Sequence, residues 1–263
     1  MRAGKGLTAP GRDPTARVTD RVEDYVRTRP GYPPAVLDAL RADAGLRPEH
    51  AVADVGSGTG LLSRLFVDNG NVVHGVEPNL AMAAVAETAL GPSGRFHRVD
   101  GRAEATGLPA ASVDLVTAGQ GFHWFKVPEA RAEFQRILRG RGAVALVWNL
   151  RRLDSTPFLR AYEAFLREWS NDYEEVSQRY AEETALRAFF GPAGWREHRF
   201  DNPQYFDLEG LRSRLLSSSY TPREDDPRRA AMLAALPALF SAHAKDGRVA
   251  FEHDTRLFVG RLS

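Results

Sequence analysis

Three glycines alternate with hydroxyl residues in a short loop that directly follows an apolar run. The run is Val52–Val55, and the loop reads Gly56-Ser57-Gly58-Thr59-Gly60, with Asp54 two residues before the first glycine. Glycine is needed where the backbone adopts a positive φ and where a ligand lies too close for a Cβ atom. In open α/β sheets, nucleotides bind in the crevice outside the carboxyl ends of the strands. The loop therefore predicts a ligand with a nucleoside part at the end of a strand.

The spacing of these glycines bears on which cofactor is bound. Dinucleotide sites favour the pattern G-x-G-x-x-G, whose third glycine lets a helix N-terminus approach a pyrophosphate. Here the pattern is G-x-G-x-G. The carboxylate of Asp54 is poorly suited to a pyrophosphate but well suited to an α-ammonium group, reached directly or through water. We therefore prefer a ligand with an amino-acid end, and an NAD(P)-dependent oxidoreductase stays open as the alternative.

A second acidic residue ends the next apolar run. Glu77 follows the predicted strand 71–76, and an acidic side chain there can accept hydrogen bonds from both hydroxyls of an adenosine ribose. Dinucleotide folds use the same device, so Glu77 alone does not separate the two cofactors. Pro78, Asn79 and Met82 follow near the expected adenine, although Met82 could equally face the core.

Composition excludes several classes of function. The net charge is +1, from 35 basic and 34 acidic residues, which leaves no extended basic field for a nucleic-acid backbone. There is no cysteine, so disulfides, thiolate metal sites and a cysteine nucleophile are excluded. No apolar run reaches the roughly 18 residues that suggest a membrane span. We expect a cytoplasmic protein without a metal site that binds neither nucleic acid nor membrane.

Strand-like and helix-like segments alternate through the first part of the chain. This order predicts an α/β fold, with a parallel, doubly wound sheet and right-handed connections. The expected strands are 50–55, 71–76, 96–99, 112–118 and 142–148, and the expected helices between them are 61–69, 79–90 and 127–138.

The remaining segments predict a leader and a lid. Residues 1–17 have little hydrophobic periodicity and are interpreted as a flexible leader to a single domain, 18–263. Helical spacing recurs at 34–44, 158–169, 176–190, 208–218 and 228–245, and strand-like patterns at 195–206 and 249–262. We expect a helical lid over the ligand edge of the sheet, contributed by residues 18–45, 150–190 and 209–246.

With these elements the chain resembles the class I S-adenosylmethionine-dependent methyltransferases, in particular the type 11, trans-aconitate methyltransferase-like small-molecule branch. The resemblance extends from about residue 20 to the C-terminus. It is carried by the glycine loop and by Tyr25–Pro33, Gly75–Asn79, Gly101–Glu104 with Leu108-Pro109, Gln120–Phe125, Val147–Asn149 and Ser217–Pro222.

The resemblance implies a Rossmann-like seven-stranded mixed sheet, whose last two strands form an antiparallel edge, and a binding site for S-adenosylmethionine. It places the methionine end on Asp54, Gly56 and Gly58, and the ribose on Glu77. Many relatives carry an aspartate where Arg102 stands, so the adenine contact would come from the backbone of Ala103 or from water. The cofactor-binding residues predicted in full are Asp54, Gly56, Ser57, Gly58, Gly60, Glu77, Pro78, Asn79, Met82, Arg102, Ala103 and Gln120.

Methyl transfer from a sulfonium requires mainly alignment and exclusion of water. A carboxylate acceptor needs no base, whereas a hydroxyl acceptor does, and a histidine with a pKa near neutrality would suit. His123 is the candidate catalytic base, although a loop-capping histidine would look the same. Arg29 could face an acceptor carboxylate or form a structural ion pair. The acceptor-binding residues predicted are Tyr25, Arg29, Tyr32, His123 and Trp124.

A motif that this chain lacks narrows the chemical class of the methyl acceptor. Enzymes that methylate amino groups of nucleic-acid bases or of glutamine usually carry an Asn/Asp-Pro-Pro-aromatic loop after the fourth strand, whereas this chain has Ala118-Gly119-Gln120-Gly121 there. The sequence therefore predicts a monomeric or homodimeric S-adenosylmethionine-dependent methyltransferase that methylates a carboxylate or hydroxyl oxygen of a small molecule. The alternatives are the NAD(P)-dependent oxidoreductase and a non-catalytic S-adenosylmethionine-binding module.

Overall fold

The fold is built on a seven-stranded mixed sheet. The computed structural model describes residues 28–171, 173, 183–218 and 220–262, so the predicted leader lies outside the described residues. The strand order is β3-β2-β1-β4-β5-β9-β6. The strands are β1 (Ala51–Val55), β2 (Val72–Val76), β3 (Phe96–Val99), β4 (Val113–Gly119), β5 (Leu138–Arg151), β6 (Arg196–Asp201) and β9 (His253–Gly260).

The direction of the strands confirms the predicted Rossmann-like topology. Strands β1 to β5 pair in parallel, which places the carboxyl ends of β1, β2 and β4 at one edge. Strand β9 is antiparallel to both β5 and β6, so the expected antiparallel edge is present. The site predicted after these strand ends is therefore assembled at one place in the fold.

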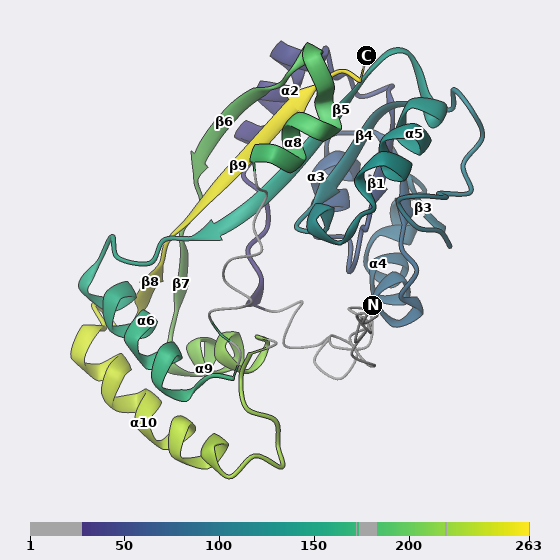
Figure 1. The fold of residues 1–263 in the computed structure, drawn as a ribbon. Helices are drawn as coiled ribbons and strands as arrows, with labels where there is room; N and C mark the ends of the chain where they lie inside the picture. Colours follow the sequence, from purple (N-terminus) through teal and green to yellow (C-terminus); the bar gives the residue numbers. More distant parts are fainter. Residues whose placement is uncertain (1–27, 172, 174–182, 219, 263) are drawn as a thin grey trace, which may run out of the picture.

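Helices cover both faces of the sheet (Figure 1). On one face α2 (Ala35–Ala44), α3 (Leu61–Asp68) and α4 (Leu80–Leu90) share one core with alternate strand residues. On the other face α5 (Val127–Ile137) and α8 (Glu183–Phe190) share a second core. Short 3-10 turns follow at η2 (Gly91–Ser93), η3 (Phe122–Trp124) and η4 (Gly191–Ala193). Because successive strand side chains point to opposite faces, the interior strands are apolar on both sides.

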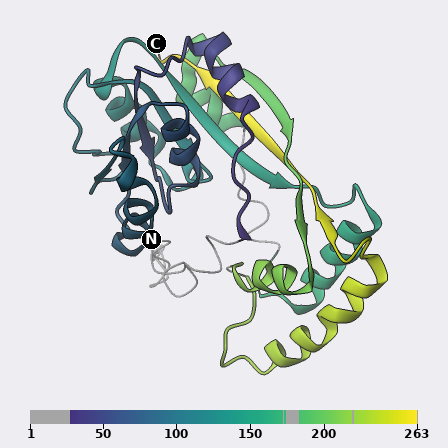
Figure 2. The same cartoon turned by 180° about the vertical axis from the view of Figure 1, so that it is seen from behind.

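A smaller unit lies beyond one end of the long strands, as both views show (Figures 1 and 2). It contains α6 (Pro157–Trp169), α9 (Leu208–Leu216), α10 (Arg228–His243) and a two-stranded sheet of β7 (Gln204–Phe206) and β8 (Val249–Phe251). These elements bury a third apolar core of their own, which includes Tyr162, Leu215 and Phe251. We call α6, α9, α10, β7 and β8 the lid.

The lid differs in extent from the segments predicted from sequence. Helices α2 and α8 fall inside the predicted ranges 18–45 and 150–190, but they pack on the sheet, because Leu40 and Phe190 are buried against it. Residues 18–27 and 174–182 lie outside the described residues. The predicted strands 195–206 and 249–262 each divide between the main sheet and the lid. The first divides at Asn202-Pro203, where the proline ring removes a ladder donor.

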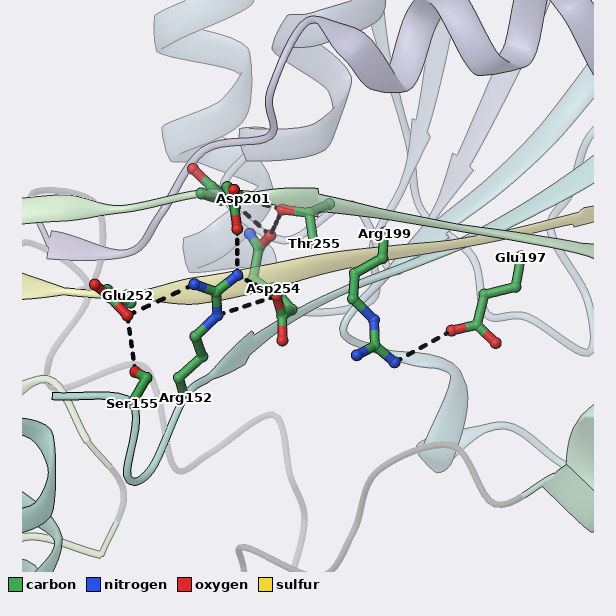
Figure 3. Close-up of polar contacts among 10 residues, drawn as sticks. Arg152, Ser155, Glu197, Arg199, Asp201, Glu252, Asp254 and Thr255 are labelled. Carbon is green, nitrogen blue, oxygen red and sulfur yellow. Dashed lines mark hydrogen bonds and ion pairs between the residues drawn. The ribbon is translucent and has the colours of Figure 1, made fainter.

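An ion-pair cluster lies where the strands leave the sheet for the lid (Figure 3). Arg152, the residue after β5, contacts the carboxylates of Asp201, Asp254 and Glu252, with distances of 2.7 Å to Asp254 and 3.6 Å to Glu252. Ser155 donates to Glu252 at 2.7 Å. One guanidinium therefore ties the ends of β6 and β9 to the start of the lid.

No helix in the described part of the chain is both long and apolar enough to cross a membrane.

Candidate functional site

A cavity of about 300 Å³ opens at the carboxyl ends of β1, β2 and β4. Its wall contains fourteen of the residues predicted from sequence, drawn from the glycine loop, the end of β2, the 102–103 turn, the end of β4 and the segment before α2. These are Arg29, Tyr32, Asp54, Gly56, Ser57, Gly58, Glu77, Pro78, Asn79, Met82, Arg102, Ala103, Gln120 and Trp124.

Asp54 is the buried carboxylate of this cavity. Its side chain is 0% exposed, and its Oδ2 accepts a hydrogen bond from the Ser63 hydroxyl at 2.6 Å. Its Oδ1 is buried without a hydrogen-bond partner among the described residues. Burial raises the pKa of Asp54 to about 7, and the negative charge of Glu77 adds to the increase. A buried carboxylate with an unused oxygen is a site for a cationic donor.

The glycine loop is fixed on the end of β2. The N–H groups of Gly56 and Ser57 both donate to the carbonyl of Val76, at 2.8 and 3.1 Å. Gly56 and Gly58 have φ values of +71° and +55°, which residues with a Cβ rarely adopt. The loop therefore presents backbone rather than side chains to the cavity.

Gly60 acts in packing and does not line the cavity. It precedes α3 with a φ of +82°, and a Cβ there would lie 2.8 Å from the Leu90 side chain and 3.1 Å from that of Ala86. Both residues belong to α4, so Gly60 lets α3 and α4 approach each other. Its predicted contact with the cofactor stays a prediction.

The Glu77 side chain both anchors the glycine loop and lines the cavity. Its Oε2 accepts from the Gly58 N–H at 2.9 Å, and its Oε1 accepts from the Asn79 N–H at 2.8 Å. Burial raises its pKa above the usual range. Each carboxylate oxygen can accept more than one hydrogen bond, so Glu77 keeps capacity for the hydroxyls of a ribose.

The far end of the cavity is apolar. Met82 faces the glycine loop, since its Cε would lie 3.1 Å from a Cβ on Gly58, and Ala103 and Phe125 add to the wall. Met82 therefore contributes to the cavity wall, and its predicted contact with the adenine stays a prediction. The Asn79 side chain, in contrast, accepts from the N–H groups of Ala81 and Met82 and caps α4.

Gln120 and Asn149 join the ends of β4 and β5. The Gln120 side chain donates to the Asn149 carbonyl at 3.1 Å and accepts from its N–H at 3.2 Å, and Gln120 has a φ of +59°. The Asn149 amide donates to the carbonyls of Pro30 and Gly31, at 3.2 and 3.1 Å. Asn149 therefore holds the segment before α2 over the cavity.

Sequence reasoning placed Asn149 in a family motif but not in the site. Its position after the fifth strand is the signal that could have found it, because ligands bind outside the carboxyl ends of parallel strands. The other cavity-lining residues that were not predicted are Pro30, Thr59, Leu61, Leu62, Glu104, Gly119, Gly121 and Phe125.

His123 and Trp124 are neighbours in η3, but only one of the two lines the cavity. Trp124 lines the cavity and is 48% exposed, whereas His123 is exposed and is not among the cavity-lining residues. Their ring centroids are 4.7 Å apart. Phe122 is buried in the apolar core that α5 and α8 share with the sheet. Tyr25 lies outside the described residues, so its predicted contact with the acceptor stays a prediction.

Within the described ranges, no group of three or more His, Cys, Asp or Glu side chains could hold a metal ion.

Comparisons with known proteins agree with this geometry. Residues 53–146 match the family model of the type 11 methyltransferases, described as a methyltransferase domain. An uncharacterized methyltransferase of Schizosaccharomyces pombe is 29% identical over 201 residues, which cover 75% of this chain and 76% of that relative. An uncharacterized methyltransferase of Mycobacterium bovis is 37% identical over 145 residues, 55% of this chain and 57% of that relative.

Solved structures share the fold. A methyltransferase structure from Anaeromyxobacter dehalogenans has a TM-score of 0.63 at 23% identity and covers 89% of this chain and 97% of its own. A methyltransferase from Geobacter sulfurreducens in complex with S-adenosylhomocysteine has a TM-score of 0.50 at 18% identity, covering 96% and 99%. These comparisons, together with the fold, support a class I S-adenosylmethionine-dependent methyltransferase.

The residues of this methyltransferase fit S-adenosylmethionine. The unused Oδ1 of Asp54 suits the α-ammonium group, and the buried hydroxyls of Ser57 and Thr59, which have no partner among the described residues, suit the carboxylate. Glu77 suits the ribose hydroxyls. A pyrophosphate on the glycine loop would instead lie beside the carboxylate of Asp54, which disfavours a dinucleotide. The methyltransferase cofactor is therefore S-adenosylmethionine.

Proposed function

We propose that this methyltransferase methylates an oxygen of a small molecule, and that the oxygen belongs to a carboxylate rather than a hydroxyl. The observation that carries the proposal is the position of His123 outside the cavity lining. A hydroxyl acceptor needs a base beside the reacting oxygen, whereas a carboxylate is already a nucleophile at neutral pH. The two carboxylates in the lining that are largely buried, Asp54 and Glu77, face the cofactor.

The chain's own side chains then bind the cofactor, align it with the acceptor and exclude water from the cavity. Asp54 holds the ammonium end and Glu77 the ribose, while Tyr32, Trp124 and Phe125 line the cavity beside the glycine loop. When bound, S-adenosylmethionine supplies a methyl group that the acceptor oxygen takes by in-line displacement. The new bond is carbon–oxygen, the carbon–sulfur bond breaks with its electron pair on sulfur, and no proton moves. An apolar wall suits this reaction because positive charge disperses as it proceeds.

Two measurements test the proposal. Calorimetry with S-adenosylhomocysteine and with NADH should give heat from the first ligand only. An acceptor screen with isotopically labelled methyl donor should then yield a product whose label is released by mild alkali, as from a methyl ester. An alkali-stable methyl ether would instead indicate a hydroxyl acceptor, and tight cofactor binding without transfer to any acceptor would favour the non-catalytic module.

A further inference from the structure

The segment that precedes α2 forms part of the cavity wall, and we call its residues 29–32 the strap. The strap residues that line the cavity are Arg29, Pro30 and Tyr32. The strap belongs to no helix or strand, so its backbone carbonyls need hydrogen-bond donors from elsewhere in the chain. The Gly31 carbonyl accepts from the Nδ2 of Asn202 at 2.8 Å. Asn202 is not itself among the cavity-lining residues, so it can act on the cavity only through the groups that it holds.

Asn202 lies where the chain passes from the main sheet to the lid. It directly follows β6, and β7 begins two residues later. Its backbone N–H donates to the His253 carbonyl at 2.9 Å, which fixes its place against β9. In β7, the Gln204 side chain donates to the Thr28 carbonyl at 3.2 Å. The junction between sheet and lid therefore holds the strap region at two points.

A second contact of Asn202 orients the side-chain amide of Asn149. The Nδ2 of Asn202 lies 3.2 Å from the Asn149 Oδ1, and the Thr255 hydroxyl donates to the same oxygen at 2.5 Å. Because one end of an amide donates and the other accepts, two donors on its oxygen direct the NH₂ group the other way. That group donates to the carbonyls of Pro30 and Gly31, at 3.2 and 3.1 Å. Asn149 is 5% exposed and Thr255 is 0% exposed, so this network is shielded from water.

The strap lies on the side of the cavity that belongs to β4. A Cβ placed on Gly119, the last residue of β4, would lie 2.5 Å from the Tyr32 hydroxyl. Strand β1, which carries Asp54, lies between β4 and β2, and Glu77 follows β2. Glu77 suits the ribose of the cofactor and Asp54 its ammonium group. The strap therefore borders the methionine end of the cofactor rather than the nucleoside end.

We propose that Asn202 is a positioning residue for the methionine end of S-adenosylmethionine. It acts directly on the Gly31 carbonyl and indirectly through the orientation of Asn149. Loss of its amide removes one donor from the strap and one of the two donors on the Asn149 oxygen, so the strap shifts relative to the glycine loop. The residues that suit the nucleoside end keep all their contacts. The inference does not depend on which acceptor is methylated.

The experiment titrates the full chain by calorimetry with two ligands. S-adenosylhomocysteine carries the amino-acid end, whereas 5′-methylthioadenosine keeps the nucleoside and lacks that end, and its affinity is measured by competition. Asn202→Ala should weaken S-adenosylhomocysteine by about three- to tenfold, as expected for a hydrogen bond, and 5′-methylthioadenosine by less than about twofold. Asn202→Asp should cause a larger selective loss, because carboxylate oxygens would face the oxygens of Gly31 and Asn149.

Thr255→Val is a second variant that tests the route through Asn149. It keeps the branched shape of the side chain and removes the hydroxyl that donates to the Asn149 oxygen. It should weaken S-adenosylhomocysteine selectively, as Asn202→Ala does. Agreement between the two variants would show that the effect passes through the strap and does not depend on one substituted position.

Asn71→Ala is the matched control for a purely structural role. The Asn71 side chain is buried just before β2, at the opposite end of the sheet from the cavity. It donates to the carbonyls of Arg47, Pro48 and His50, at 2.7, 3.3 and 2.8 Å, so it too is an amide that holds a loop. Asn71→Ala should lower the melting temperature and leave the Kd of both ligands unchanged. All titrations are made well below the melting temperature of each variant.

Three results would overturn the inference. The first is unchanged binding of S-adenosylhomocysteine in Asn202→Ala or in Thr255→Val. The second is equal weakening of both ligands in Asn202→Ala, which would assign Asn202 to the fold. The third is the same selective loss in Asn71→Ala, which would show a response of the whole chain rather than of the strap.

Discussion

The carboxylate of Asp54 accepts the Ser63 hydroxyl through Oδ2 at 2.6 Å, while its Oδ1 has no partner in the described part of the chain. Ser63 lies on α3, so the bond fixes the orientation of the carboxylate relative to the glycine loop that opens this helix. This bond leaves Oδ1 as the carboxylate oxygen that a cofactor can use, and Asp54 is one of the residues that line the cavity.

Asp54→Asn should weaken binding of S-adenosylhomocysteine by at least about tenfold, since a hydrogen bond to a charged group contributes about 1.5–3 kcal/mol. The variant should fold normally, because it removes a buried charge. Asp114→Asn is the matched control: Asp114 accepts from the Ala51 N–H and from Arg139 at the other end of the sheet. It should lower the melting temperature and leave the Kd unchanged. Calorimetry and thermal melting check both variants, and an unaltered Kd for Asp54→Asn would contradict the assignment.

Cofactor affinity should depend on pH through Asp54. In the ligand-free chain its pKa is raised from 3.8 to about 7, so the folded state binds a proton that the unfolded state has lost between these values. The ligand-free chain should therefore lose stability as pH rises from about 4 to about 7. The ammonium group needs the ionised carboxylate, so affinity should increase with pH from about 6 to about 8. Calorimetry in buffers of different ionisation enthalpy should detect the released proton, and Asp54→Asn should remove it.

Gly60→Ala should destabilise the fold by about 2–4 kcal/mol, because it combines a positive φ with overpacking against α4. Gly94→Ala is the control for φ alone: Gly94 has a φ of +67°, and nothing lies within 4 Å of its Cβ position. That variant should cost only about 1 kcal/mol. Urea denaturation of both variants measures the difference. Equal losses would show that the contact with Leu90 carries no energy.

Arg152→Met should destabilise the chain by about 1–3 kcal/mol, since three carboxylates then face one another without their cation. Added salt should recover part of this loss by screening the repulsion. Arg187→Met is the control, because the Arg187–Glu183 pair is 70% and 67% exposed and should contribute at most about 0.5 kcal/mol. Denaturation at low and high salt compares them. A salt-insensitive loss would show that Arg152 acts through packing instead.

His123→Ala should change turnover by less than about twofold if the acceptor is a carboxylate, since no base is then required. Cofactor affinity should also stay constant, because His123 is not among the cavity-lining residues. Initial rates across pH 6–9 provide the measurement. A loss of about tenfold or more that follows the titration of a histidine would restore His123 as the base and a hydroxyl as the acceptor.

The cofactor half of the molecule could be predicted from sequence because its signals are local. Asp54, the glycines and Glu77 each follow an apolar strand, and parallel topology brings all strand ends to one edge. The exception is Gly60. It packs against Leu90, which lies on a different helix, and nothing in the sequence near the loop indicates this contact. A glycine required for helix packing looks the same in sequence as one required for a ligand.

The lid half was harder to predict because its assembly depends on distant segments. Helix α8 has the same kind of amphipathic pattern as α6, yet one covers the sheet and the other builds the lid. Tyr162, Leu215 and Phe251 of the lid core come from three regions of the chain, so no local motif contains them. His123 and Trp124 show a related limit, because which neighbour points inward depends on the 3-10 turn that holds them.

Strands β5 and β9 are paired over eight register positions, from Val144↔Gly260 to Arg151↔His253, and the last of these pairs borders the lid. The lid is thus joined to the main sheet by a ladder of backbone hydrogen bonds, not by a hinge loop. Moving the lid away would require twisting or breaking that ladder. Side chains within the lid can consequently be exchanged while the spacing between the lid and the main sheet is retained.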